Sequence, residues 1–186
     1  MVREGYHRGV HASIEPSAWV LRWSGWIRPG GAVLDLAAGG GRHARWLARM
    51  GFEVDAVDRD ISQLADAPAN VRVLEDDIES GPWPYAGRRF DAIVVANYLH
   101  RPLLATLVDS LEPGGLLVYE TFAAGNERFG RPRNPEFLLG PGELLQAFAA
   151  LTVVAFEQGE VAQPRPAMIQ RLAAANGLPG ALPEPL

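Results

Sequence analysis

Ala32-Val33-Leu34-Asp35-Leu36-Ala37-Ala38-Gly39-Gly40-Gly41-Arg42-His43-Ala44 is the stretch that decides the fold. Its first half is a short apolar run, which is typical of a strand covered on both faces. The three consecutive glycines let the backbone turn sharply and approach a ligand closely. Apolar residues at helical spacing follow as far as Met50. A helix that begins beside a glycine turn presents free N–H groups to a ligand, so the stretch predicts a nucleoside-containing cofactor.

The composition excludes several classes of protein. The chain has 186 residues, 48% of them apolar, which is enough for one domain with its own core. It has no cysteine, which excludes disulfides, zinc thiolate sites and cysteine nucleophiles. All 17 basic residues are arginine, which excludes a Schiff-base enzyme and a P-loop lysine. The net charge of −5 argues against nucleic acid as a partner.

The same overview sets the expected organisation. No apolar run approaches the roughly 18 residues of a membrane span, and the N-terminus lacks a signal-peptide core, so we expect a cytoplasmic protein without a membrane partner. We expect a single domain over residues 1–176, with residues 1–15 as an N-terminal arm. Residues 177–186 are rich in Pro and Gly and are expected to form a flexible tail.

Strands and helices alternate along the chain, which predicts an α/β fold. Strands are expected at 33–36, 52–57, 71–74, 90–96, 116–121, 151–157 and 167–175. Helices are expected at 16–27, 42–50, 60–66, 102–111 and 143–150, the first with its tryptophans packed on the sheet. The last two strands read as an edge hairpin. We therefore predict a Rossmann-like, seven-stranded, mostly parallel sheet with one antiparallel edge strand and helices on both faces.

Acids and polar residues follow the strands where a ligand of such a sheet binds. Asp58 ends the second strand, where it can accept ribose hydroxyls. Asp76-Asp77-Ile78 follows the third strand, where an acid can accept from an adenine amino group. The fourth strand delivers Asn97, Tyr98 and His100 to the same edge.

Two segments have a less specific pattern. The connection 122–140 is long and leaves the sheet at this edge, so it can form a wall of the pocket. Its Arg128, Arg131 and Arg133 favour an anionic substrate, although an arginine-decorated solvent loop explains them equally well. His7 and His11 stand four residues apart but lack the rest of a zinc motif, and we predict no metal site.

Two cofactors fit the opening stretch taken alone. Gly39 to Ala44 formally matches G-x-G-x-x-A, with Asp58 nearly twenty residues on, which is the fingerprint of a nicotinamide enzyme. The chain, however, has no later substrate domain, and two edge strands after five βα units suit a different family.

The chain resembles the class I S-adenosylmethionine-dependent methyltransferases. Asp35 and the glycines resemble the family's first motif, and Asp58 matches its ribose-binding acid. Asp76-Asp77-Ile78 resembles its adenine-binding turn, and Pro113-Gly114-Gly115 resembles the turn before strand five. One departure is Ala37, where the family commonly has glycine; alanine fits there if that residue has ordinary strand angles. Gly41-Arg42-His43 is similar to small tellurite-resistance-like members.

The resemblance implies a site for S-adenosylmethionine. Its implied cofactor-binding residues are Asp35, Ala37, Gly39, Gly41, Asp58, Arg59, Asp76, Asp77, Ile78 and Asn97. Tyr98 would lie beside the methyl group, and His100 is the candidate base for a hard nucleophile, with a surface position before Pro102 as its alternative role. A soft nucleophile such as sulfur would need no base.

The acceptor is expected to be a small molecule. Nucleic-acid amino-methyltransferases of the family carry Asn or Asp, two prolines and an aromatic residue after strand four, whereas this chain has Asn97-Tyr98-Leu99-His100. Two alternatives stay open at this point: a nicotinamide-dependent reductase and a non-catalytic cofactor-binding protein.

Overall fold

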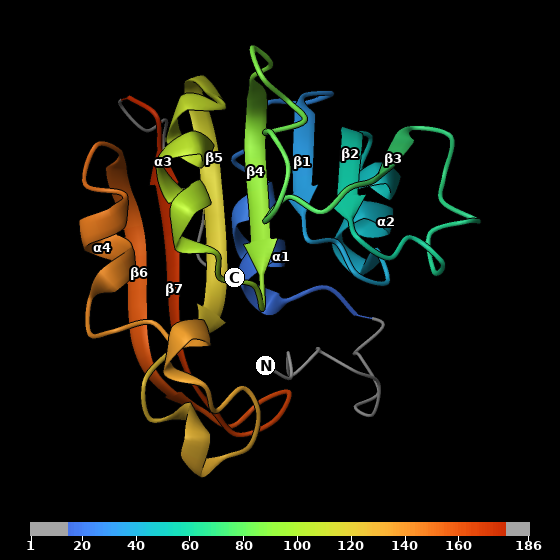
Figure 1. Ribbon diagram of the computed structural model, residues 1–186. Helices are drawn as coiled ribbons and strands as arrows, with labels where there is room; N and C mark the ends of the chain where they lie inside the picture. The colour runs from blue at the N-terminus through green and yellow to red at the C-terminus, as the bar shows by residue number, and fades with distance from the viewer. Residues whose placement is uncertain (1–14, 178–186) are drawn as a thin grey trace.

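The computed structural model describes residues 15–177 (Figure 1). Its strands are β1 Ala32–Leu36, β2 Glu53–Asp58, β3 Val71–Glu75, β4 Phe90–Ala96, β5 Leu111–Phe122, β6 Thr152–Val161 and β7 Ala167–Ala175. Its α-helices are α1 Ala18–Ser24, α2 Arg42–Arg49, α3 Leu104–Asp109 and α4 Glu143–Ala147. Three short 3₁₀ turns are η1 Arg101–Leu103, η2 Asn126–Arg128 and η3 Pro135–Phe137.

All seven strands form one sheet, in the order β3-β2-β1-β4-β5-β7-β6. The pairs among β1 to β5 are parallel, and β7 is antiparallel to both of its neighbours. The predicted fold class is therefore confirmed, with β6 as the outermost strand and the antiparallel β7 next to it. The strand order reverses between β1 and β4, so a ligand is expected outside their carboxyl ends, at the bottom of Figure 1.

Helices cover both faces of the sheet (Figure 1). One core cluster packs α1 and α2 against residues such as Val33 and Val94. A second cluster packs α3 and α4 against the opposite face. Trp19 and Trp23 are 1% and 3% exposed and belong to the first cluster, which confirms that they pack on the sheet. None of the helices in residues 15–177 is long and apolar enough to cross a membrane.

The helix predicted over residues 60–66 does not form. The Asp60 N–H donates to the Asp58 side chain at 3.0 Å, and the Ser62 N–H donates to the Asp60 side chain at 3.0 Å. Such Asx turns offer the backbone an alternative to helical bonds. The connection between β2 and β3 is consequently a series of turns.

The helix predicted over residues 102–111 is shorter than expected and divided. It consists of η1 and α3, and it ends at Asp109. The next strand then begins at Leu111, five residues earlier than predicted, because the fully buried Leu111 pairs with Phe90. The Pro-Gly-Gly turn lies inside β5 and is held there by Asn176, whose N–H donates to the Gly115 carbonyl at 2.8 Å.

The remaining differences concern element ends. The last helix ends at Ala147 rather than at residue 150, and the sixth strand continues to Val161. The predicted strand 167–175 is β7 with unchanged bounds. The predictions for the arm as far as residue 14, with His7 and His11, and for the tail from residue 178 fall outside the described residues.

Candidate cofactor and acceptor site

The glycine turn lies between β1 and α2, at the carboxyl edge of the sheet. Gly39 and Gly41 have φ of +55° and +71°, a region that side chains rarely adopt. A Cβ on Gly41 would lie 2.1 Å from Leu64 Cδ2, whereas a Cβ on Gly39 would meet nothing within 4 Å. The backbone angles favour glycine at both positions, and a side chain at Gly41 would in addition require the Leu64 side chain to move.

Two non-glycine residues share this left-handed conformation. Ala37 has φ +53° and Asn97 has φ +58°, and they follow β1 and β4, which are neighbours in the sheet. The condition under which alanine would fit there, ordinary strand angles at Ala37, is therefore not met. The conformation costs a residue with a Cβ about 1 kcal/mol or more relative to glycine, and such strain is concentrated at functional sites.

Asp58 links the end of β2 to the glycine turn. Its carboxylate accepts the Gly39 N–H at 2.7 Å and the Asp60 N–H at 3.0 Å. Its carbonyl accepts the Asp76 N–H at 3.1 Å, so the acid after β3 lies beside it. The structure thus brings together Gly39, Asp58 and Asp76, as the sequence predicted.

The turn after β3 is partly built into the fold. The Asp77 carboxylate accepts the Glu79 N–H at 3.2 Å, and Ile78 is buried in the core with 8% exposure. Asp76 is half-buried, and Arg59 and Asp77 are exposed near the same edge. The predicted Asp76-Asp77-Ile78 turn therefore adjoins Asp58, although Ile78 also serves the core.

Asp35 is buried beneath the glycine turn, with 1% exposure. It accepts the Ala44 N–H at 2.9 Å, and its second oxygen lies 3.8 Å from His43 Nδ1. Burial raises the pKa of Asp35 to about 7. Burial, and secondarily the nearby Arg42 charge, lowers the pKa of His43 to about 3. His43 is therefore neutral at physiological pH.

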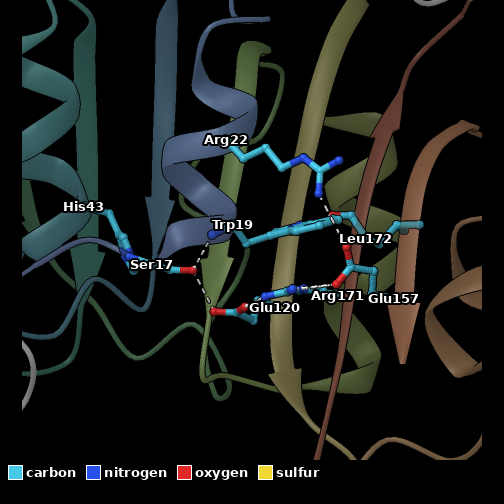
Figure 2. Close-up of polar contacts among 8 residues, drawn as sticks. All are labelled: Ser17, Trp19, Arg22, His43, Glu120, Glu157, Arg171 and Leu172. Carbon is cyan, nitrogen blue, oxygen red and sulfur yellow. Dashed lines mark hydrogen bonds and ion pairs between the residues drawn. The ribbon is translucent and has the colours of Figure 1, made fainter. Parts of the chain in front are cut away.

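His43 leads to a polar network that sequence reasoning missed (Figure 2). Its Nε2 accepts the Ser17 N–H at 3.2 Å, and the Ser17 hydroxyl donates to Glu120 at 2.7 Å. Arg171 then joins Glu120 to Glu157. Sequence reasoning placed Ser17 in the first turn of an expected helix and Glu120 within an expected strand, and neither position reveals a partner 26 or 103 residues away.

Trp19 lies at the centre of this network, between two guanidinium groups (Figure 2). Arg171 and Arg22 are 4.8 and 5.7 Å from its ring centre. Its indole N–H donates to the Leu172 carbonyl at 3.2 Å. These contacts fix α1 over β5, β7 and β6, so the start of α1 is held at the carboxyl edge.

The polar residues after β4 have different environments. Asn97 is exposed, and its N–H donates to the Glu120 carbonyl at 2.9 Å. The Tyr98 hydroxyl is buried without a hydrogen-bond partner in the described part of the chain, and burial raises its pKa, with a contribution from the Glu79 charge. His100 is half-buried and precedes η1. Only Asn97 is thus presented openly at the edge.

The 122–140 connection is anchored to the sheet. Asn126 is 2% exposed; it accepts the Met168 N–H and donates to the Pro132 carbonyl, both at 3.2 Å. Arg101 donates to the Glu136 and Leu138 carbonyls. Arg128 is within 3.5 Å of Glu160, whereas Arg131 and Arg133 are exposed. No cluster of potential metal ligands exists among residues 15–177.

Comparisons with known proteins agree with this geometry. Residues 33–115 match the sequence profile of a family described as a methyltransferase domain. This segment holds the glycine turn, Asp58, the Asp76-Asp77-Ile78 turn and Asn97. Residues 33–115 are thus similar to a methyltransferase domain, and S-adenosylmethionine is the cofactor that such a domain implies. A comparison with curated protein sequences gave no match.

Solved structures share the fold of this chain at low identity. TehB from Haemophilus influenzae is 17% identical, with a TM-score of 0.69 over 84% of this chain. The chain spans 60% of the length of that protein. The N-methyltransferase NodS from Bradyrhizobium japonicum WM9 is 20% identical, with a TM-score of 0.63 over 85% of this chain and 91% of NodS. The [4+2]-cyclase SpnF is 16% identical, with a TM-score of 0.66 over 86% of this chain and 78% of SpnF.

The chemistry of the edge fits S-adenosylmethionine better than a dinucleotide. Asp58, Asp76 and Asp77 gather at the carboxyl ends of β2 and β3. A sulfonium and an ammonium group are attracted to such acids, whereas a pyrophosphate is repelled. The Gly39 N–H, which a dinucleotide phosphate would need, already donates to Asp58. The nicotinamide alternative has no support in the comparisons.

Proposed function

We propose that this methyltransferase domain methylates a small-molecule acceptor bound over the carboxyl ends of β4 and β5. The observation that carries the proposal is the acidic carboxyl edge around the glycine turn, within the segment that matches the methyltransferase profile. The small acceptor is supported by two solved neighbours. Coclaurine N-methyltransferase, 14% identical with a TM-score of 0.62, is bound to N-methylheliamine and SAH, and NodS is an N-methyltransferase.

The cofactor half of the proposal assigns roles to the edge residues. Bound S-adenosylmethionine supplies a methyl group that its sulfonium charge already activates. Asp58 accepts the ribose hydroxyls, and Asp76 or Asp77 accepts from the adenine amino group. Gly39 and Gly41 let the backbone approach the methionine portion. Asp35 orders the turn through its bond to the Ala44 N–H.

The acceptor half rests on the residues after β4. Asn97 aligns the acceptor with the methyl group, because in-line displacement depends mainly on geometry. The Tyr98 hydroxyl is buried and its pKa is raised, so Tyr98 shapes the wall beside the methyl group and acts neither as a donor to the acceptor nor as a base. His100 accepts the proton of the acceptor when the nucleophilic atom is hard, such as oxygen or nitrogen. A soft nucleophile such as sulfur needs no base, and His100 then has no catalytic role.

Three further expectations belong to the same proposal. The exposed Arg131 and Arg133 attract an anionic acceptor. The domain extends over residues 1–176. The protein acts in the cytoplasm, which the composition of the chain supports.

A panel of small acceptors tests the function. Each is incubated with the full chain and S-adenosylmethionine, and S-adenosylhomocysteine is quantified by mass spectrometry. We expect release with at least one small thiol, amine, hydroxyl or carboxylate acceptor, and loss of that release in Asn97→Ala. If no acceptor in the panel led to release of S-adenosylhomocysteine although the cofactor bound tightly, a non-catalytic cofactor-binding protein would be favoured. The structural neighbour SpnF is a [4+2]-cyclase, so a protein of this fold can have another activity.

A further inference from the structure

Ser17 is a junction between three parts of the molecule (Figure 2). Its hydroxyl accepts the Trp19 N–H at 3.1 Å and thereby caps α1. The same hydroxyl donates to Glu120 at the carboxyl end of β5, at 2.7 Å. Its backbone N–H donates to His43 in the first turn of α2, at 3.2 Å. One half-buried residue thus bonds to the cofactor side and to the acceptor side of the edge.

His43 continues the junction to the centre of the glycine turn. It is 3% exposed, and its Nε2 is occupied as an acceptor, so the ring proton resides on Nδ1. Nδ1 faces Asp35 at 3.8 Å, and Asp35 in turn accepts the Ala44 N–H. His43 therefore lies between the acid of the glycine motif and the cap of α1.

Glu120 completes the junction at the acceptor side. Its carbonyl accepts the Asn97 N–H at 2.9 Å, which joins the ends of β4 and β5. Its carboxylate lies 3.4 Å from Arg171, which also pairs with Glu157. The Glu120 side chain is only 16% exposed, so both of its partners hold it in one orientation.

We propose that His43 and Ser17 are positioning residues, which hold the glycine turn and the end of β5 in a fixed relation so that cofactor and acceptor meet in line. The inference rests on the proposed function, because it concerns the same edge of the sheet. It adds residues that contact neither reactant. In-line transfer needs this arrangement, since an error of about 1 Å in alignment is costly.

Two substitutions of His43 test the cofactor side. His43→Leu removes both ring nitrogens from a buried site, whereas His43→Gln can still accept the Ser17 N–H. We expect the Kd for S-adenosylhomocysteine, measured by calorimetry, to rise about tenfold in His43→Leu, as for the loss of one or two hydrogen bonds, and less in His43→Gln. Equal affinities in both variants and the wild type would overturn the proposal.

A matched pair at Ser17 separates capping from positioning. Asn and Asp both cap helices well, but only Asn can donate to Glu120, and Asp places a second carboxylate beside it. We expect Ser17→Asn to keep near-wild-type kcat and Ser17→Asp to lose about tenfold in kcat with an unchanged melting temperature. Glu120→Gln should rescue Ser17→Asp. Identical behaviour of the two Ser17 variants would contradict the positioning role.

A spectroscopic readout distinguishes positioning from simple folding. ¹⁵N chemical shifts should report His43 as the Nδ1–H tautomer in the wild type and in Ser17→Asn between pH 5 and 8. A His43 ring that is protonated or in the Nε2–H tautomer would overturn the assignment. The proposed function is tested by a different result. A wild-type chain that binds no S-adenosylmethionine would refute the proposed function, whereas the tautomer of His43 tests the hydrogen bond to Ser17 whether or not the cofactor binds.

Discussion

The two halves of the carboxyl edge are built differently. The half at β1, β2 and β3, where we propose that the cofactor binds and which we call the cofactor half, is held by bonds over shorter sequence separations, such as 19 residues for Asp58 to Gly39 and two residues for Asp77 to Glu79. The half at β4, β5 and β7, which we call the acceptor half because we propose that the acceptor binds there, is held by bonds over much longer separations, such as 103 residues for Ser17 to Glu120. Its outer wall, residues 122–140, is anchored by the buried Asn126.

This difference determines which half can be recognised from short sequence motifs. A fixed cofactor can be bound by short motifs, because its groups always lie at the same places along the strands. The acceptor half has no such constraint, and its residues come from α1, β5 and the long connection. Short sequence motifs can therefore predict the cofactor, whereas the acceptor depends on tertiary contacts that the sequence does not reveal.

The largest expected effect is in the glycine turn. Gly41→Val should destabilise the fold by about 2–5 kcal/mol, because φ is +71° and the new Cβ would meet Leu64. Gly39→Val is the matched control, with strain of about 1–2 kcal/mol and open space around its Cβ. Urea unfolding checks both. Equal losses would show that packing against Leu64 is unimportant.

The second prediction concerns the pH dependence of stability at Asp35 and His43. The pKa of Asp35 is raised to about 7 in the fold, so the folded state binds more protons than the unfolded one and stability falls as pH rises from about 4 to 7. The pKa of His43 is lowered to about 3, so its contribution rises with pH between about 3 and 6.5. In the wild type the two contributions oppose each other.

Single variants should expose each contribution. Asp35→Asn keeps the His43 contribution, so its stability should rise with pH from 4.5 to 6.5; His43→Gln should show a fall. The limiting slope is about 1.4 kcal/mol per pH unit in each case. This window lies above the lowered pKa values of Asp66, Asp91 and Glu143. The two variants should differ from the wild type in opposite directions in the slope of unfolding free energy against pH. If both slopes changed in the same direction, the assignment of a protonated Asp35 beside a neutral His43 would be contradicted.

The third prediction separates the cofactor half from the rest of the sheet. Asp58→Asn should weaken S-adenosylmethionine binding by about 10–100-fold, the effect of losing a charged acceptor worth roughly 1.5–3 kcal/mol. Glu53→Gln is the matched control, since Glu53 is exposed at the other end of the same strand. Calorimetry measures the Kd of S-adenosylmethionine in both variants. Similar losses of affinity in the two variants would contradict a binding site at the carboxyl edge.

The smallest expected effect is in the outer wall of the acceptor half. Replacing both Arg131 and Arg133 by Ala should raise KM for an anionic acceptor about threefold to tenfold and leave the Kd of the cofactor unchanged, because exposed charges contribute roughly 1 kcal/mol or less. Replacing the exposed Arg49 and Arg89 together by Ala removes the same two charges and controls for the change in net charge. An unchanged KM would show that Arg131 and Arg133 are solvent-exposed residues that do not contribute to acceptor binding.

The sequence was sufficient for much of the fold and of the cofactor half. Apolar runs located all seven strands, since strands buried on both faces leave few other interpretations. Asp58 and the glycines were recognisable because their spacing follows from the βαβ unit. The helix expected at residues 60–66 failed because Asp58 and Asp60 bond to nearby backbone instead.

The acceptor half was less accessible to sequence reasoning. Ser17 lay in the first turn of an expected helix, and nothing in the local sequence pairs it with His43 or Glu120. The left-handed conformation of Ala37 was not foreseen, because propensity carries no information on a left-handed position that the fold imposes. Sequence reasoning placed Tyr98 beside the methyl group. The burial of its hydroxyl results from packing of the ring against the core, which the local sequence does not reveal.

Parallel calorimetric titrations of the wild-type chain with S-adenosylmethionine and NADH test the central claim most directly. We predict one site for S-adenosylmethionine with a micromolar Kd, weakened at least tenfold in Asp58→Asn, and no measurable heat with NADH. Tight NADH binding without a response to S-adenosylmethionine would contradict the account.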